Sequence, residues 1–341
     1  MIKVLYAGSP EPAALTLRAL IEASGASGES GAFKIVGVLT NPPTAKGRHK
    51  ELTPTPVGSL VLENCTGENA IPVFTPEHLD AACREQIASL EADILVCFAY
   101  GHIFGPKFLS MFKMGGINLH PSLLPKYRGC TPVPASILNR DTETAFTVQT
   151  LANEMDAGNI LAQKKVSLTG RETAGSLLTD CAKEGAALII DLLREADKNG
   201  ELTKGIPQSG EASYTQIIKK EDGRLDWKKT TAELDAQIRA YTPDPGCFCQ
   251  WGSDEKSENI RILEAHILED EKRSCANSPY KPEMESQTSG TVLAFDKPTG
   301  IWIKTGDGIL CVTKLQKQGK NAMGYKDFMN GTRDFIGTLL K

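Results

Sequence analysis

The sequence predicts an α/β protein with two domains: a Rossmann-like domain with a mostly parallel sheet, then a small C-terminal β-barrel. The chain has 341 residues, and chains beyond about 250–300 residues usually divide into domains. Short β-branched runs alternate with helical patterns through roughly the first 190 residues, which is typical of βαβ units. Short strands bounded by glycines follow later in the chain, which favours a small barrel.

The first domain is expected to contain several parallel strands joined by helices. The expected strands are Ile2–Tyr6, Lys34–Leu39, Asp93–Phe98 and Gly116–His120. The expected helices lie near Ala13–Glu22, Pro76–Leu90 and Thr173–Leu193. Their spacing fits right-handed crossover connections within one sheet.

The segment Asp197–Ser213 is rich in Gly, Lys, Ser and Pro and has no apolar period, so we interpret it as a linker. A boundary inside it gives a first domain of residues 1–206 and a second of residues 207–341. The second domain is expected to contain a helix over Thr231–Tyr241 and the strands Ile260–Ala265, Gly290–Phe295, Gly300–Lys304 and Gly308–Leu315. The polar inserts Ser24–Gly31 and Glu271–Gly290 are expected to be mobile loops.

Composition and charge exclude several classes of protein. The net charge of −4 argues against a protein that coats nucleic acid with its whole surface, but it permits a local basic patch. Nine cysteines without a paired CxxC spacing indicate neither a disulfide framework nor a zinc site, and Cys247 and Cys249 are interpreted as structural. No metal is expected. The first apolar run is too short for a signal peptide and no run approaches membrane-spanning length, so we expect a cytoplasmic protein.

The most unusual local chemistry lies in INLHPSLLPKYRG, at residues 117–129. Asn118 and His120 face the same side of the expected strand, and Pro121 ends it because it has no N–H for the ladder. In an open α/β sheet, ligands bind beyond the carboxyl ends of the strands. An amide and an imidazole there could stabilise an oxyanion and move a proton, with Asp156 as the candidate group that orients the imidazole. Spacing alone leaves equally open that Asn118 caps a turn and His120 is a packing residue.

The segment Gly116–Gln163 resembles the formyltransferase family that uses 10-formyltetrahydrofolate. The resemblance lies in the Asn-x-His strand end, the SLLP loop, the RG turn and the distant Asp-x-Gly. Further similar pieces are AGSPEPAALTLRAL, KGRHKELTPTPV, DILVCFAYG, KKEDGRLDW, IRAYTPDPG and TGDGILCVTKLQ. The resemblance implies a Rossmann-like catalytic domain followed by a tRNA-binding barrel like an oligonucleotide-binding fold.

The resemblance also implies roles for individual residues. Asn118, His120 and Asp156 correspond to the family's catalytic residues. The folate loop corresponds to Ser122, Leu123, Leu124 and Pro125, and the turn beside the pteridine ring to Phe98, Ala99, Tyr100 and Gly101. From the residues alone, Phe98 and Tyr100 are more simply explained as packing at the sheet edge. The implied reaction is transfer of the formyl group of 10-formyltetrahydrofolate to the α-amino group of methionine on initiator methionyl-tRNA. We expect a monomer.

The loop Asn41–Val57 carries Lys46, Arg48, His49 and Lys50 within five residues. Such a short basic run is more often a solvated loop than a nucleic-acid site. The resemblance, however, implies that the loop enters the acceptor arm of tRNA through Lys46, Arg48 and Lys50, with Arg48 the strongest candidate. Pro43, Thr44 and Glu51 depart from the family pattern and leave the loop less positive. A second basic cluster consists of Lys314, Lys317, Lys320 and Arg333, which could contact the tRNA backbone or only solubilise the barrel.

Two alternatives remain open. One is a formyltransferase for a small-molecule amine, and the other is an RNA-binding module without activity. The additional barrel and the KKEDGRLDW junction favour a tRNA substrate over a small amine. The presence of all three candidate catalytic residues favours an enzyme over a binding module.

Overall fold

The computed structural model describes residues 1–25, 31–46, 51–252, 257–275 and 278–341, in two compact units. Unit 1 consists of residues 1–132, 143–167 and 176–216. Unit 2 consists of residues 133–142, 168–175 and 217–341. The domain boundary after residue 206 stays a prediction.

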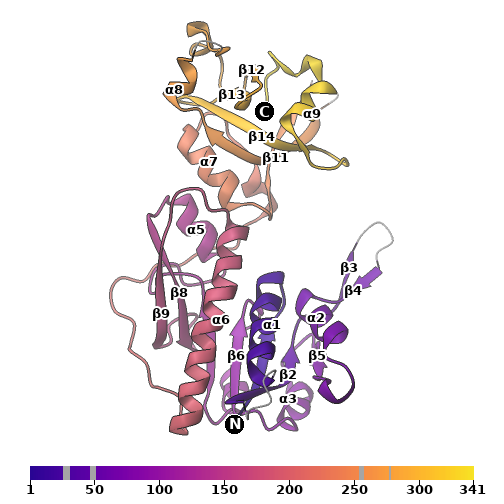
Figure 1. Ribbon diagram of the computed structural model, residues 1–341, viewed down its shortest axis with the longest axis vertical. Coiled ribbons are helices and arrows are strands. Elements are labelled where there is room, and N and C mark those ends of the chain that lie inside the picture. Colours follow the sequence, from indigo (N-terminus) through magenta and orange to yellow (C-terminus); the bar gives the residue numbers. More distant parts are fainter. Residues whose placement is uncertain (26–30, 47–50, 253–256, 276–277) are drawn as a thin grey trace. The chain divides into compact units, whose positions relative to one another are not determined.

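Unit 1 is built on a seven-stranded sheet with the strand order β5-β2-β1-β6-β7-β8-β9. The strands are β1 (Ile2–Gly8), β2 (Phe33–Leu39), β5 (Val73–Phe74), β6 (Ile94–Phe98), β7 (Gly116–His120), β8 (Glu143–Thr150) and β9 (Ile160–Ser167). The pairs from β5 to β7 are parallel, and β8 and β9 add antiparallel strands at one edge (Figure 1). The expected mostly parallel α/β sheet is therefore confirmed.

Helices cover both faces of this sheet. They are α1 (Glu11–Gly25), α2 (Pro56–Asn64), α3 (Ala81–Ala88), α4 (Pro106–Leu109) and α6 (Ala174–Asn199). On one face, Thr16 Oγ1 of α1 donates to the carbonyl oxygen of Ala182 in α6, and a Cβ at Gly185 of α6 would overlap the side chain of Leu119 in β7. Because Leu119 faces α6, Asn118 and His120 face the opposite side of the sheet.

The other face packs against a cluster of buried aromatic and apolar side chains. The cluster includes Leu5, Leu39, Cys83, Ile87, Tyr100, Phe104, Phe108 and Phe112. The ring of Phe104 stacks between those of Tyr100 and Phe108, with centroid separations of 5.5 Å to Tyr100 and 5.2 Å to Phe108. This packing holds the carboxyl end of β6 beside the end of β7.

Unit 2 contains an antiparallel sheet with the order β10-β11-β14-β13-β12, and β15 pairs with β14. Its strands are β10 (Cys247–Trp251), β11 (Glu258–Ile267), β12 (Val292–Asp296), β13 (Gly300–Lys304), β14 (Ile309–Lys317) and β15 (Met323–Gly324). Its helices are α5 (Pro132–Leu138), α7 (Thr231–Ala240), α8 (Asp270–Arg273) and α9 (Tyr325–Asn330). Cys247 and Cys249 are fully buried in β10, as packing residues.

The C-terminal tail joins the two edge strands of this sheet. Gln250 in β10 exchanges backbone hydrogen bonds of 2.7 and 2.9 Å with Lys341. On the other edge, Leu340 N–H donates to the Gly290 carbonyl oxygen at 2.9 Å, and Val292 N–H donates to that of Thr338 at 2.9 Å. Both edges therefore pair with the tail, and the sheet closes on itself as a small barrel requires.

Two segments differ from the sequence expectation. Residues 206–216, named the strap here, are not a free linker: Ile206 pairs with Ile160, and Arg128 N–H donates to the Ser213 carbonyl oxygen at 2.8 Å. In the insert Glu271–Gly290, Tyr280 and Met284 pack against the cluster around Trp302, so part of this insert is anchored. Residues 26–30 of the other insert lie outside the described residues. Within the described ranges, none of the helices combines the length and the apolar character needed to cross a bilayer.

Candidate active site

Asn118 and His120 stand at the carboxyl end of β7, as expected. The antiparallel neighbour β8 places Gln149 opposite Asn118 and Thr147 opposite His120. Directly opposed residues of an antiparallel pair project to the same face, so the Gln149 amide joins the two predicted side chains. His120 is only 4% exposed, which leaves its imidazole dependent on protein partners.

The turn between β8 and β9 brings Asp156 to this pair. Gln149 Nε2 donates to Asp156 Oδ1 at 2.8 Å, and the Gly129 N–H donates to Oδ2 at 2.8 Å. Asn118 Nδ2 lies 3.4 Å from Oδ1, and His120 Nδ1 lies 3.6 Å from Oδ2. The structure thus brings the three predicted catalytic residues together, with Asn118 and His120 beside the carboxylate of Asp156.

Glycines allow the chain to approach this closely. A Cβ at Gly158 would overlap the carbonyl oxygen of Thr150, so the turn needs the glycine of its Asp-x-Gly sequence. Gly129 has a φ of +105°, and a Cβ there would lie 2.9 Å from Thr215 Oγ1 in the strap. The backbone of Gly129 can therefore turn its N–H toward Asp156.

The second nitrogen of His120 is fixed by a backbone group. Nε2 lies 2.9 Å from the carbonyl oxygen of Tyr127. Since a carbonyl oxygen only accepts, Nε2 carries a hydrogen, and Nδ1 faces the Asp156 carboxylate. The imidazole therefore has a defined orientation, with its Nδ1 edge toward the carboxylate.

The predicted folate loop has two buried and two partly exposed residues. Ser122 is fully buried: its Oγ donates to the Lys126 carbonyl oxygen at 2.6 Å, and its own carbonyl oxygen accepts from Thr147 Oγ1 at 2.7 Å. Leu124 is also buried, whereas Leu123 and Pro125 are partly exposed. Ser122 and Leu124 thus hold the shape of the loop, and Leu123 and Pro125 form its accessible part.

The turn after β6 exposes backbone rather than rings. Phe98 and Tyr100 are each 1% exposed, and Tyr100 stacks on Phe104 in the core. Ala99 and Gly101 are exposed and have φ values of +52° and +87°. A flat ligand at this turn would meet the backbone of Ala99 and Gly101.

Cys97 lies opposite Asn118 on the neighbouring strand β6 but is unsuited to be a nucleophile. Burial, with a smaller contribution from the negative charge of Asp156, raises the pKa of the Cys97 thiol to about 12. The thiol therefore stays protonated near neutral pH, and the thiolate is the reactive form. The chemistry of the site rests on the amide, the imidazole and the carboxylate.

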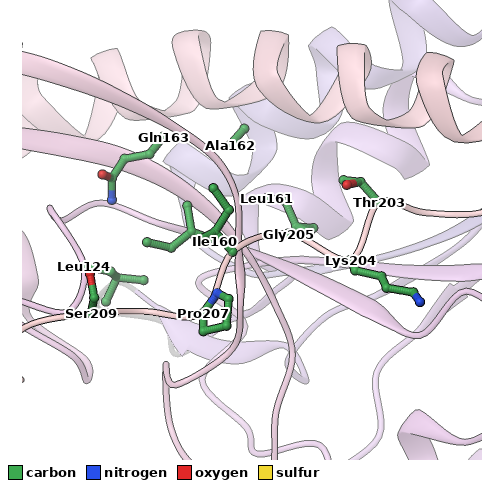
Figure 2. Close-up of a pocket in the computed structure, with 11 residues that line it drawn as sticks. Leu124, Ile160, Leu161, Ala162, Gln163, Thr203, Lys204, Gly205, Pro207 and Ser209 are labelled. Carbon is green, nitrogen blue, oxygen red and sulfur yellow. The ribbon is translucent and has the colours of Figure 1, made fainter.

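A cavity of about 650 Å³ lies beside the loop but does not include the three predicted catalytic residues. Its lining consists of Leu124, Ile160, Leu161, Ala162, Gln163, Thr203, Lys204, Gly205, Ile206, Pro207 and Ser209. Figure 2 shows Leu124 and Ser209 at one end and Thr203 and Lys204 at the other. This cavity is separate from the cluster around Asp156.

The predicted tRNA loop begins and ends in a small antiparallel ribbon. β3 (Thr44–Lys46) pairs with β4 (Glu51–Thr53), and the register places Lys46 opposite Glu51. Arg48 and Lys50 lie outside the described residues, as does the side chain of Lys46. The predicted contacts of these three residues with tRNA stay predictions.

Two lysines of the second basic cluster, Lys314 and Lys317, contact other side chains of the protein. Lys314 Nζ pairs with Glu264 at 3.0 Å. Lys317 Nζ lies 4.7 Å from the centroid of the Trp251 ring and 3.9 Å from Glu258. Lys320 is exposed, and the side chain of Arg333 lies outside the described residues.

Sequence reasoning missed Gln149, Arg128 and Gln208. Gln149 is placed by the register of β7 and β8, which no local pattern predicts. Gln208 lies in the strap, whose Gly- and Ser-rich composition indicated a linker. For Arg128, the only signal in the sequence was the RG turn of the segment that resembles the formyltransferase family.

Comparisons with known proteins agree with this architecture. Residues 3–193 match the family described as formyl transferase, and residues 217–333 match that described as formyl transferase, C-terminal domain. A methionyl-tRNA formyltransferase of Treponema denticola is 43% identical over 340 residues, which cover 98% of each chain. HypX from Aquifex aeolicus, solved with tetrahydrofolic acid, is similar with a TM-score of 0.60 and 14% identity, covering 98% of this chain and 48% of HypX. WlaRD, a sugar 3N-formyl transferase, has a TM-score of 0.57 and 19% identity, covering 94% of this chain and 99% of WlaRD. The last two similarities show the fold alone.

Proposed function

Because this chain belongs to the formyl transferase family, with both the N-terminal and the C-terminal domain, we infer that it formylates methionyl-tRNA. The observation that carries this inference is the near full-length match to a methionyl-tRNA formyltransferase. The acceptor is the free α-amino group of methionine, and the product is N-formylmethionyl-tRNA. The chain is thus a one-carbon group transferase that acts in translation initiation.

The proposed formyl donor is 10-formyltetrahydrofolate. Support comes from the family itself and from the likeness to HypX, which was solved with tetrahydrofolic acid. The accessible residues Leu123 and Pro125, with the exposed turn at Ala99 and Gly101, would contact the folate. A backbone turn beside apolar side chains is a common way to hold a flat heterocycle.

In the proposed mechanism, the amine nitrogen attacks the formyl carbon, and the carbonyl electrons move onto oxygen. The tetrahedral intermediate collapses as the bond from carbon to folate N10 breaks and N10 takes up a proton. An α-amino group titrates at about 7.7–8.0, so much of it is neutral and competent near neutral pH. The charge on oxygen is the harder problem, and preorganised donors address it best.

The site residues divide these tasks. The contact of 3.4 Å from Asn118 Nδ2 to Asp156 is long, so the amide can turn to the developing oxyanion. The gap of 3.6 Å between His120 Nδ1 and Asp156 Oδ2 is likewise too long for a strong direct hydrogen bond. A proton that leaves the amine can therefore pass to the Asp156 carboxylate, directly or through one water.

The deciding experiment offers the protein 10-formyltetrahydrofolate with either charged initiator tRNA or glycinamide ribonucleotide. We expect formyl transfer to the tRNA only. Transfer to the nucleotide alone would favour a small-molecule enzyme, and transfer to neither would favour a binding module. The small-molecule acceptor is included in the test because the fold is similar to that of a sugar formyl transferase.

The proposal includes further statements about the whole chain. We propose a catalytic domain of residues 1–206, a tRNA-binding barrel of residues 207–341, and tRNA contacts by Lys46, Arg48 and Lys50. We also propose a monomer in the cytoplasm, where initiator tRNA is charged. Sedimentation of the purified protein and fractionation of cells test these two statements.

A further inference from the structure

The strap contacts the turn that carries Asp156 through the side chains of Gln208 and Tyr214, and only that of Gln208 is seen to bind the backbone of Asp156 among the described residues. The Gln208 Nε2 donates hydrogen bonds to the carbonyl oxygens of Asp156 and Gly158, both at 2.8 Å. Asp156 has a φ of +53°, in the left-handed region. A residue other than glycine persists in that region where surrounding contacts hold it. Gln208 supplies two such contacts from a segment outside the sheet.

Arg128 determines which way the Gln208 amide points. Arg128 Nε and Nη2 lie 3.1 and 2.8 Å from Gln208 Oε1. Because a guanidinium only donates, the amide oxygen must face Arg128 and the NH₂ group must face the turn. Arg128 is itself held by Tyr214, whose hydroxyl oxygen lies 3.0 Å from Nη1. The orientation of the amide is therefore specified by the structure.

Gln208 also reaches the carboxylate through a second residue. Its Nε2 lies 3.2 Å from Oε1 of Gln149, and Gln149 Nε2 donates to Asp156 Oδ1 at 2.8 Å. One amide thus contacts both the backbone of the turn and the side chain that binds its carboxylate. Loss of this amide would loosen both supports together.

We propose that Gln208 is a positioning residue for formyl transfer, which sets the Asp156 carboxylate in line with Asn118 and His120. The kinetic consequence of this inference rests on the proposed function, and its structural consequence does not. The strap is then part of the active site and more than a linker. Gln208 acts through Asp156 and Gln149, so its loss should affect turnover more than substrate binding.

Gln208→Glu tests the proposal with almost no change of shape. The substitution places a carboxylate oxygen against the carbonyl oxygens of Asp156 and Gly158 while keeping an acceptor toward Arg128. A displacement of about 1 Å at a catalytic group can cost on the order of 100-fold in rate. We therefore expect kcat for tRNA formylation to fall about 10- to 100-fold, with both KM values within about threefold.

Gln216→Glu is the matched control. Gln216 lies in the same strap, and its side chain is exposed. The substitution makes the same chemical change at a side chain that, within the described part of the chain, has no hydrogen bond to the Asp156 turn; the backbone carbonyl oxygen of Gln216, which accepts from Thr131 Oγ1 at 2.8 Å, is unchanged. We expect its kcat to stay within about twofold of the wild type.

A second readout needs no substrate. The Gly129 N–H donates to Asp156 Oδ2 at 2.8 Å, so its NMR resonance reports the position of the carboxylate. We expect this resonance to shift in Gln208→Glu and to stay in place in Gln216→Glu. If circular dichroism shows that Gln208→Glu does not fold, the same two measurements are made on Gln208→Met, whose side chain has a similar length but no amide group.

The outcomes separate this inference from the proposed function. A wild-type kcat in the folded variant, or a reduced kcat with an unmoved Gly129 resonance, would overturn the positioning role. If the wild-type protein formylates no tRNA, the proposed function fails. The Gly129 resonance then still decides whether Gln208 positions the Asp156 carboxylate.

Discussion

Asp156 has more partners than any other candidate catalytic residue. Its Oδ1 accepts from Gln149 and its Oδ2 from the Gly129 N–H, while Asn118 and His120 lie at the longer separations of 3.4 and 3.6 Å. The carboxylate is thus held by groups that need not move, next to groups that can rearrange around a substrate. This division is what a preorganised site requires.

Asp156→Asn should therefore reduce kcat strongly while the protein stays folded. The substitution removes the negative charge that faces His120 and the acceptor for the amine proton. Loss of acid–base assistance typically costs about 10²–10⁴-fold in rate, and we expect a value in that range. Initial rates of tRNA formylation measure it, with circular dichroism as the control for folding. Full turnover in a folded variant would contradict the assigned role.

Buried thiols should make the fold sensitive to high pH. Burial raises the pKa of Cys97 to about 12, from the ordinary thiol value of 9.0. A group whose pKa is raised in the folded state stabilises that state fully below the unfolded pKa, and this stabilisation is lost as pH rises toward the folded pKa. Cys97 thus disfavours the folded state increasingly from about pH 9 to about pH 12.

Cys97→Ala should reduce this pH sensitivity. Between about pH 8 and about pH 10, we expect the free energy of unfolding to fall by about 1 kcal/mol less in Cys97→Ala than in the wild type. Urea titrations at the two pH values measure the difference. Cys130→Ala, at an exposed cysteine, is the control and should keep the wild-type slope. Equal slopes in all three proteins would contradict the prediction.

At the scale of elements, the β3–β4 ribbon presents the predicted tRNA loop with an acidic residue at its base. Glu51 is exposed and lies opposite Lys46 in the register. Because each neutralised phosphate releases counterions, a carboxylate here should weaken tRNA binding and reduce its dependence on salt. The effect of the weaker positive charge of this loop can therefore be measured as the affinity for tRNA and its dependence on salt.

Glu51→Lys should tighten tRNA binding and make it more sensitive to salt. One added phosphate contact increases the slope of log K against log salt by roughly 0.7–0.9. Binding titrations of initiator tRNA at several salt concentrations measure this slope. Glu85→Lys, at an exposed position of α3, makes the same charge change away from the ribbon. An equal gain from both variants would show that only net charge matters.

At the scale of the whole molecule, the last residues of the chain hold unit 2 together. Leu340 is 2% exposed, and its N–H donates to the Gly290 carbonyl oxygen at 2.9 Å. The tail also pairs with Gln250 on the opposite edge. The final strand-like pairing of the barrel thus depends on a few terminal residues.

Leu340→Ala should destabilise unit 2 markedly. Truncation of a buried leucine typically costs about 2–5 kcal/mol. Urea unfolding followed by tryptophan fluorescence measures the loss, because the three tryptophans of the chain, Trp227, Trp251 and Trp302, all lie in unit 2. Asn321→Ala, at an exposed side chain of the same unit, is the control and should leave the midpoint unchanged. An unchanged midpoint for Leu340→Ala would mean that the tail does not stabilise the barrel.

The sequence by itself determined the strand β7 and the common face of Asn118 and His120. Both follow from local rules: strand side chains alternate with a period of two, and Pro121 cannot continue a central ladder. The strands β8 and β9 were missed, although β8 pairs directly with β7. The polar run in ILAQKKVS suits an exposed edge strand but does not stand out as a strand in the sequence.

Only the tertiary structure decided which side chains surround the carboxylate. Asp156 lies 38 positions after Asn118 in the sequence, and Gln208 lies 52 positions after Asp156. These contacts depend on the register between strands and on the path of turns, and neither has a local period in the sequence. Closure of the barrel by the tail has the same origin, because backbone hydrogen bonds between distant segments leave no residue pattern of their own.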